Sequence, residues 1–221
     1  MNNKLSLQQW IAIILPLILI LFMWTAFVNL TQLFGLTNGY FISFAIYWIL
    51  WCLIIPVIIL RGFGPLVNLF KSVDPRFGNK PDITLFLLTW PIVLVIFFSF
   101  LPHLKDITFP IVLLSIAFGI NGIAEEIFWR GLYISIFPEN RFLNYIYPSI
   151  FFALWHICPL SVMTSRYSGG IISFIVISLL LGLSWGYYTI KTGSIRWSSI
   201  MHSVFDILGL GGILYSSWFL K

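Results

Sequence analysis

The sequence predicts an all-α integral membrane protein, a polytopic bundle of about seven transmembrane helices. Of its 221 residues, 60% are hydrophobic and only 9% are charged, whereas a soluble domain carries about 25% charged residues. The apolar residues also occur in runs of about 20, the length that an α-helix needs to cross a bilayer. The chain length suits a single integral membrane domain over residues 1–221, without a separate soluble module.

Seven apolar stretches qualify as spans. They cover residues 8–33, 40–60, 83–101, 108–137, 142–163, 170–190 and 196–219. The first stretch is longer than the apolar part of a signal peptide and lacks a small-x-small cleavage pattern, so we expect it to span the membrane. One long or broken span would change the count to eight. Pro159, three residues after His156, is expected to break or kink the fifth stretch there. The sizeable loop at residues 61–82 is turn-rich, and a short interfacial helix is predicted around residues 66–71.

The distribution of lysine and arginine predicts the orientation in the cell membrane. This topology places eight cations on the side of the N-terminus and three on the opposite side. The first group is Lys4, Arg61, Lys71, Arg76, Lys80, Arg141, Lys191 and Arg196, and the second is Lys105, Arg166 and Lys221. Because cytoplasmic loops carry the excess of positive charge, the N-terminus is expected in the cytoplasm. No basic run has interleaved aromatics, so the expected partner is the lipid bilayer and not a nucleic acid.

Ionisable residues inside the apolar spans are the informative feature of the sequence. The predicted spans contain six such groups well inside their ends: Glu125, Glu126, Arg130, His156, His202 and Asp206. An ionised side chain in hydrocarbon is costly, so such residues face the interior of a bundle, find partners and usually mark function. They lie on the fourth, fifth and seventh spans, and we expect them to converge.

The spacing of these residues predicts which of them share a helix face. Glu126 can reach Arg130, because residues four apart lie on the same face. Glu125 points about 100° away and is left free for another role. His202 and Asp206 are also four apart, and Phe152 stands one turn before His156.

Two chemistries fit a converging set of two histidines and two carboxylates. In a dry bundle the set can activate a water for attack on a carbonyl, with Glu125 as general base, a histidine that orients the water and a donor pair for the oxyanion. The same four groups, Glu125, His156, His202 and Asp206, could instead hold a divalent metal such as zinc with an open position for water. Taken singly, Glu126–Arg130 is typical of a buried ion pair and Phe152 of a core residue.

Together, Glu125-Glu126-xxx-Arg130, Phe152-xxx-His156 and His202-xxx-Asp206 resemble the CAAX prenyl endopeptidase family. That family includes bacteriocin-processing and self-immunity relatives, the CPBP intramembrane proteases. The patterns stand in the family's order and cover the chain from about residue 108 to the end, which makes residues 108–221 the expected catalytic core. The resemblance implies an all-helical membrane endopeptidase with its active site in a cavity below the membrane surface.

The resemblance also implies roles for individual residues. Glu125 and His156 would activate the water, and His202 with Asp206 would stabilise the oxyanion or position the water. Relatives carry Asn or Asp at the last position, and an ionised Asp206 cannot donate to an oxyanion; it fits metal ligation or pairing with a His202 imidazolium better. The family is described as metalloproteases, while a metal-free glutamate mechanism has also been argued for it, and the sequence leaves both open.

The supporting residues would be Glu126, Arg130 and Phe152, with the ion pair holding the site and contacting the C-terminal end of the substrate. The expected function is therefore hydrolysis of a peptide bond in a membrane-associated peptide or protein. A compact chain of this kind looks bacterial, which suggests substrates such as peptide pheromones or bacteriocin precursors. The alternative is a non-enzymatic self-immunity-type or scaffold protein that retains the buried polar cluster, and a proton-relaying transporter is a weaker one.

Overall fold

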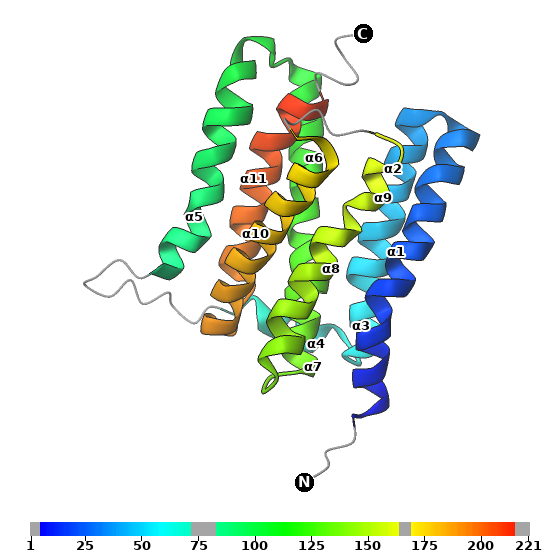
Figure 1. Cartoon of the computed structure of the whole chain (residues 1–221), viewed down its shortest axis with the longest axis vertical. Helices are drawn as coiled ribbons and strands as arrows, with labels where there is room; N and C mark the ends of the chain where they lie inside the picture. The colour runs from blue at the N-terminus through cyan, green and yellow to red at the C-terminus, as the bar shows by residue number, and fades with distance from the viewer. Residues whose placement is uncertain (1–4, 72–82, 164–168, 215–221) are drawn as a thin grey trace.

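A computed structural model describes residues 5–71, 83–163 and 169–214 of the chain, and within these ranges it contains helices and no strand. The helices form one bundle with nearly common direction (Figure 1). In this view α1 (Leu7–Phe34) and α2 (Leu36–Ile46) lie on one side, and α5 (Ile83–Val95) lies on the other. The helices with the ionisable residues lie between them. The protein is therefore an all-α polytopic bundle, as the sequence predicts.

Each apolar stretch forms one helical segment, and several segments combine α-helical, π-helical and 3₁₀ turns. In chain order after α1 they are α2 with η1 (Tyr47–Ile54) and α3 (Ile55–Ile59); α5 with η2 (Ile96–Phe100) and η3 (Leu101–Asp106); α6 (Phe109–Glu126) with η4 (Ile127–Leu132) and α7 (Tyr133–Ile136); η5 (Phe142–Ile146) with α8 (Tyr147–Trp155) and α9 (Ile157–Leu160); α10 (Gly170–Thr192); and α11 (Arg196–Leu214). The short helix predicted in the first large loop is α4 (Phe63–Leu69).

Five of these segments, within the described part of the chain, are long and apolar enough to cross a membrane. They cover Leu7–Phe34, Leu36–Ile59, Leu85–Asp106, Phe109–Ile136 and Gly170–Thr192. The fifth predicted span is divided at His156 between α8 and α9, and the seventh, α11, carries several polar side chains along its 19 residues. A multi-pass membrane protein is thus confirmed, whereas the count of seven stays a prediction. So does the orientation, because five of its cations (Lys4, Arg76, Lys80, Arg166 and Lys221) lie outside the described residues.

A close contact between α6 and α11 brings the fourth and seventh predicted spans together. A Cβ atom added at Gly122 would lie 2.4 Å from the backbone nitrogen of Ser203 and 2.7 Å from the carbonyl carbon of His202. No side chain other than hydrogen fits at this distance, so the glycine lets the two backbones approach. This approach places His202 directly over the C-terminal turn of α6, where Glu125 and Glu126 lie.

The break after α8 has a simple cause. Proline has no N–H, so Pro159 cannot donate to the carbonyl of Trp155 and the regular helix ends there. His156 occupies the turn between the two helices, and it is only partly buried. The sequence predicted this break from Pro159.

Aromatic side chains connect the first two helical segments to the centre of the bundle. The rings of Phe27 and Phe44 both lie 6.1 Å from the Trp155 ring. Tyr47 stacks on Trp155 with 3.7 Å between ring centroids and 16° between ring planes. Through these contacts the N-terminal part of the chain, which carries no recognisable motif, packs against the helix that ends at His156.

Candidate functional site

The six ionisable residues of the predicted spans do converge, and His202 lies at the centre of the group. Its Nδ1 is 3.1 Å from Glu126 Oε1, and its Nε2 is 3.4 Å from Glu125 Oε2 and 3.8 Å from Asp206 Oδ1. His202 is 3% exposed and the three carboxylate residues are at most 8% exposed. Three carboxylates from two helices thus surround one imidazole ring away from water.

Glu126 forms the ion pair that its spacing predicts. Arg130 Nη1 lies 2.9 Å from Glu126 Oε1, and both side chains are almost fully buried. The guanidinium of Arg130 also lies over the ring of Phe152, 4.4 Å from its centroid. Phe152 in turn has edge contacts with the rings of His156, at 4.9 Å, and His202, at 5.8 Å. The predicted supporting residues therefore contact one another, and Phe152 also contacts both histidine rings.

Glu125 points away from that ion pair, as predicted, and it has hydrogen-bond donors of its own. Its Oε1 accepts hydrogen bonds from Tyr47 Oη at 3.0 Å and from Trp155 Nε1 at 2.8 Å. Tyr47 Oη itself accepts from Trp129 Nε1 at 2.8 Å. The spacing of the ionisable residues did not indicate these two donors, because they are neutral aromatic side chains on other helices.

The nitrogens of the two histidines face different surroundings. His156 Nδ1 lies 2.8 Å from the carbonyl oxygen of Phe152. A carbonyl only accepts, so Nδ1 carries the proton and Nε2 of the neutral ring is an acceptor. His202 faces carboxylate oxygens with both nitrogens, and the Trp185 ring lies 4.3 Å from it. Carboxylates and an indole face both favour a cation, so His202 is suited to carry two protons.

Asn121 is a site residue that the sequence patterns did not indicate. It stands one turn before Glu125 on α6, and its Nδ2 donates to Glu125 Oε2 at 3.1 Å and to Asp206 Oδ2 at 3.0 Å. Its Oδ1 accepts from Trp48 Nε1 at 2.7 Å. A search for amide side chains four residues away from the ionisable residues would have found it.

A cavity of about 330 Å³ opens beside these residues. Its polar lining includes Asn121, Glu125, His156, His202 and Asp206, with Phe152 beside them, and three serines, Ser99, Ser173 and Ser178, also line it. The opposite wall is mostly apolar and comes from α5, η2, α10 and α11; it includes Trp90, Leu94, Phe98, Phe174, Ile177, Leu181 and Phe205.

Among the described residues, those that line this cavity include no lysine or arginine. Arg130, which the resemblance placed near the C-terminal end of a substrate, is 2% exposed and is not part of the lining. In this structure Arg130 therefore supports the site from below and does not face the cavity.

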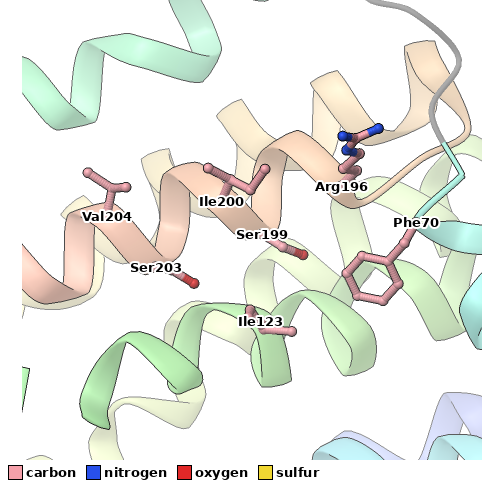
Figure 2. A pocket seen from close by; sticks show the side chains of 7 residues that line it. All are labelled: Phe70, Ile123, Arg196, Ser199, Ile200, Ser203 and Val204. Carbon is pink, nitrogen blue, oxygen red and sulfur yellow. The ribbon is translucent and has the colours of Figure 1, made fainter. Parts of the chain in front are cut away.

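A second hollow lies on the outer side of the contact between α6 and α11, with a volume of about 410 Å³. Figure 2 shows Ser199 and Ser203 of α11 directed toward Ile123 of α6, with Phe70 and Arg196 at one end. None of the six converging ionisable residues lines it. The hollow is thus separate from the candidate site.

The four residues proposed as metal ligands lack the donor geometry of a metal site. No group of three or more His, Cys, Asp or Glu side chains in the described ranges is arranged to hold a metal ion. His202 directs both nitrogens at carboxylates, and a nitrogen that donates its proton cannot ligate a metal at the same time. As placed, the residues do not fit a zinc site.

The fold and this geometry define a multi-pass membrane protein with a buried carboxylate–histidine site that opens into a mostly apolar cavity. Residues 106–208 match the family model described as "Type II CAAX prenyl endopeptidase Rce1-like". This segment contains all three motifs, and the match confirms the resemblance to the CAAX prenyl endopeptidase family. No curated protein and no solved structure matches the chain at a significant level.

Proposed function

We propose that the protein is an intramembrane endopeptidase that hydrolyses a peptide bond in a membrane-associated peptide or protein. The observation that carries the proposal is that Glu125, His156, His202 and Asp206 line one cavity. All four residues belong to the segment that matches the endopeptidase family. We also propose that residues 1–221 form one membrane domain with the catalytic core at residues 108–221. Water, a base and a donor for the oxyanion are the minimum requirements for amide hydrolysis, and these residues can supply the last two.

The acceptor atoms in the cavity indicate which groups activate the water in the first step. Glu125 Oε1 is occupied by Tyr47 and Trp155, which leaves Oε2 as the atom on the side of His202 and Asn121. His156 Nε2 is the second acceptor. A water between these atoms attacks the substrate carbonyl carbon while one of its protons passes to the Glu125–His156 pair. The π bond of the carbonyl breaks, and its electrons move to the oxygen.

His202 has the opposite role, because its surroundings favour a protonated ring. Its Nε2–H donates to the carbonyl oxygen as negative charge develops there, and Glu126 holds the ring through Nδ1. Asp206 is the carboxylate that keeps Nε2 protonated, and this role requires no hydrogen-bond donation from Asp206. The tetrahedral intermediate then breaks the C–N bond as the amine nitrogen takes the proton from the Glu125–His156 pair, and the base is restored.

The cavity walls indicate the character of the substrate. A mostly apolar wall without a cation favours an uncharged, apolar segment around the bond that is cleaved, and it excludes water from the reacting groups. A C-terminal carboxylate would find no lysine or arginine among the described residues that line the cavity. The matching family is described as a prenyl endopeptidase family. A prenyl group is an apolar chain that suits the apolar wall, so a peptide with a prenylated cysteine is the candidate substrate.

The test compares whole membranes, so the substrate does not have to be identified first. Membranes from cells that express the protein or its Glu125→Gln variant are compared by mass spectrometry for new peptide termini. We expect termini that require Glu125, and a purified-enzyme rate at least 100-fold lower for the variant, since general base catalysis supplies about 10²–10⁴-fold. Glu139→Gln, at an exposed position, is the matched control. A metal chelator should leave the rate unchanged.

Identical termini from the protein and from the Glu125→Gln variant would contradict the endopeptidase. If Glu125→Gln also retained full biological function, the buried cluster would belong to a non-enzymatic membrane protein. A chelator-sensitive rate would instead preserve the protease and replace the metal-free mechanism.

A further inference from the structure

We propose that Asn121 is a positioning residue for the reaction, whose amide group holds the carboxylates of Glu125 and Asp206 in their working orientation. The inference rests on the proposed function. Its basis is the set of three hydrogen bonds at this side chain: Nδ2 donates at 3.1 Å to Glu125 and at 3.0 Å to Asp206, and Oδ1 accepts at 2.7 Å from Trp48. The three partners come from η1, α6 and α11.

The chemistry of these partners fixes the orientation of the amide. An indole N–H can only donate, so Trp48 requires the oxygen of Asn121 to face it. The NH₂ group must then face the two carboxylates, and its two protons match two acceptors. Rotation of the amide by 180° would place an oxygen against both carboxylates and a nitrogen against the indole, and every one of the three hydrogen bonds would be lost.

The amide is needed because carboxylates that share a buried site repel each other. Glu125, Glu126 and Asp206 all contact His202 at 3.1–3.8 Å, and the guanidinium of Arg130 pairs with Glu126. His202 alone therefore stands between Glu125 and Asp206 as a charged donor. A neutral NH₂ group that donates one proton to each carboxylate offsets this repulsion and holds the two groups apart.

The arrangement also gives a role to the first hundred residues. Trp48 lies outside residues 106–208, the part that matches the family model. Its indole fixes Asn121, and Tyr47, the preceding residue, donates to the other oxygen of Glu125. The η1 turns thus orient the proposed base from both sides, although they contain no ionisable catalytic group.

The first experiment measures turnover of purified, reconstituted protein on an internally quenched peptide with a farnesylated cysteine. Asn121→Leu, nearly the same size but without donors, should lower kcat about 100-fold with KM changed by less than about threefold, the scale expected for a misplaced catalytic group. Trp48→Phe keeps the amide and should give a smaller loss. The matched control is Asn144→Leu, because Asn144 is also buried but donates only to the carbonyls of Phe137 and Pro138; it should lower stability and leave kcat unchanged.

The second experiment measures the coupling of Asn121 to Asp206 without any activity. Asn121→Asp places a third carboxylate beside the other two and should lower the unfolding temperature by about 5 °C or more. Adding Asp206→Asn restores one amide and one carboxylate at this contact. The unfolding temperature of the double variant should therefore return most of the way to the wild-type value. Glu125 still lacks its donor in the double variant, so kcat should stay low.

The outcomes separate this inference from the proposed function. Wild-type kcat in Asn121→Leu, or additive temperature shifts in the double variant, would overturn the role of Asn121. The double variant could regain its unfolding temperature while no Glu125-dependent cleavage is found. In that case the amide contact is a structural feature only. Its positioning role in a reaction would be overturned, and the endopeptidase would be rejected.

Discussion

The substitution Gly122→Ala tests whether the contact between α6 and α11 sets the geometry of the site. The added Cβ would lie 2.4 Å from Ser203 N and 2.7 Å from His202 C, and both atoms belong to the backbone. Ordinary contact begins at 3.4 Å, so the helices must separate by about 1 Å, and overpacking of this kind costs about 1–3 kcal/mol. His202 moves with α11, away from Glu125 and Glu126.

A shift of about 1 Å at a catalytic group can lower the rate about 100-fold. We therefore expect Gly122→Ala to lose about this factor in kcat on the quenched farnesyl-cysteine peptide, with a lower unfolding temperature. Gly64→Ala is the matched control, because Gly64 lies in α4 and an added Cβ meets nothing within 4 Å. Wild-type turnover and an unchanged unfolding temperature in Gly122→Ala would refute the reasoning.

Two further substitutions test the partners of the buried carboxylates. Tyr47→Phe removes one of the two donors to Glu125 Oε1. It should lower kcat about tenfold or more, since a hydrogen bond to a charged group is worth about 1.5–3 kcal/mol. Unchanged kcat would show that Tyr47 does not orient the base. Arg130→Gln leaves Glu126 without its cation and should lower the free energy of unfolding by about 3–5 kcal/mol. Denaturant titration measures this, with the exposed Arg141→Gln as control, and equal stabilities would contradict a structural ion pair.

Hydrophobic runs predicted the helical segments closely, because a bilayer requires long apolar helices whatever they pack against. The first predicted stretch, residues 8–33, corresponds to Leu7–Phe34, and the fourth, residues 108–137, to Phe109–Ile136. The interruption at His156 followed from Pro159. The π-helical turns, such as η4 at Ile127–Leu132, could not be predicted, because they depend on packing between helices and leave no local pattern.

The convergence of the charged residues was predictable for the same physical reason, since an ion in hydrocarbon must find a partner. Helical spacing also predicted the Glu126–Arg130 pair. The neutral donors were missed: Tyr47, Trp48 and Trp155 are aromatic residues among many in this sequence, and nothing in their spacing separates a donor from a core residue. Their role depends on which helices become neighbours, and this is visible only in three dimensions.

The two aromatic donors on one oxygen of Glu125 have a consequence for stereochemistry. Tyr47 and Trp155 cover the Oε1 edge of this carboxylate, so a nucleophile can form only along the other edge. The attacked carbonyl then has to present one particular face to the water. The site therefore determines the direction in which a peptide lies across the cavity. A peptide bound in the opposite N-to-C direction would bring the other face of its amide plane to the water and should remain intact.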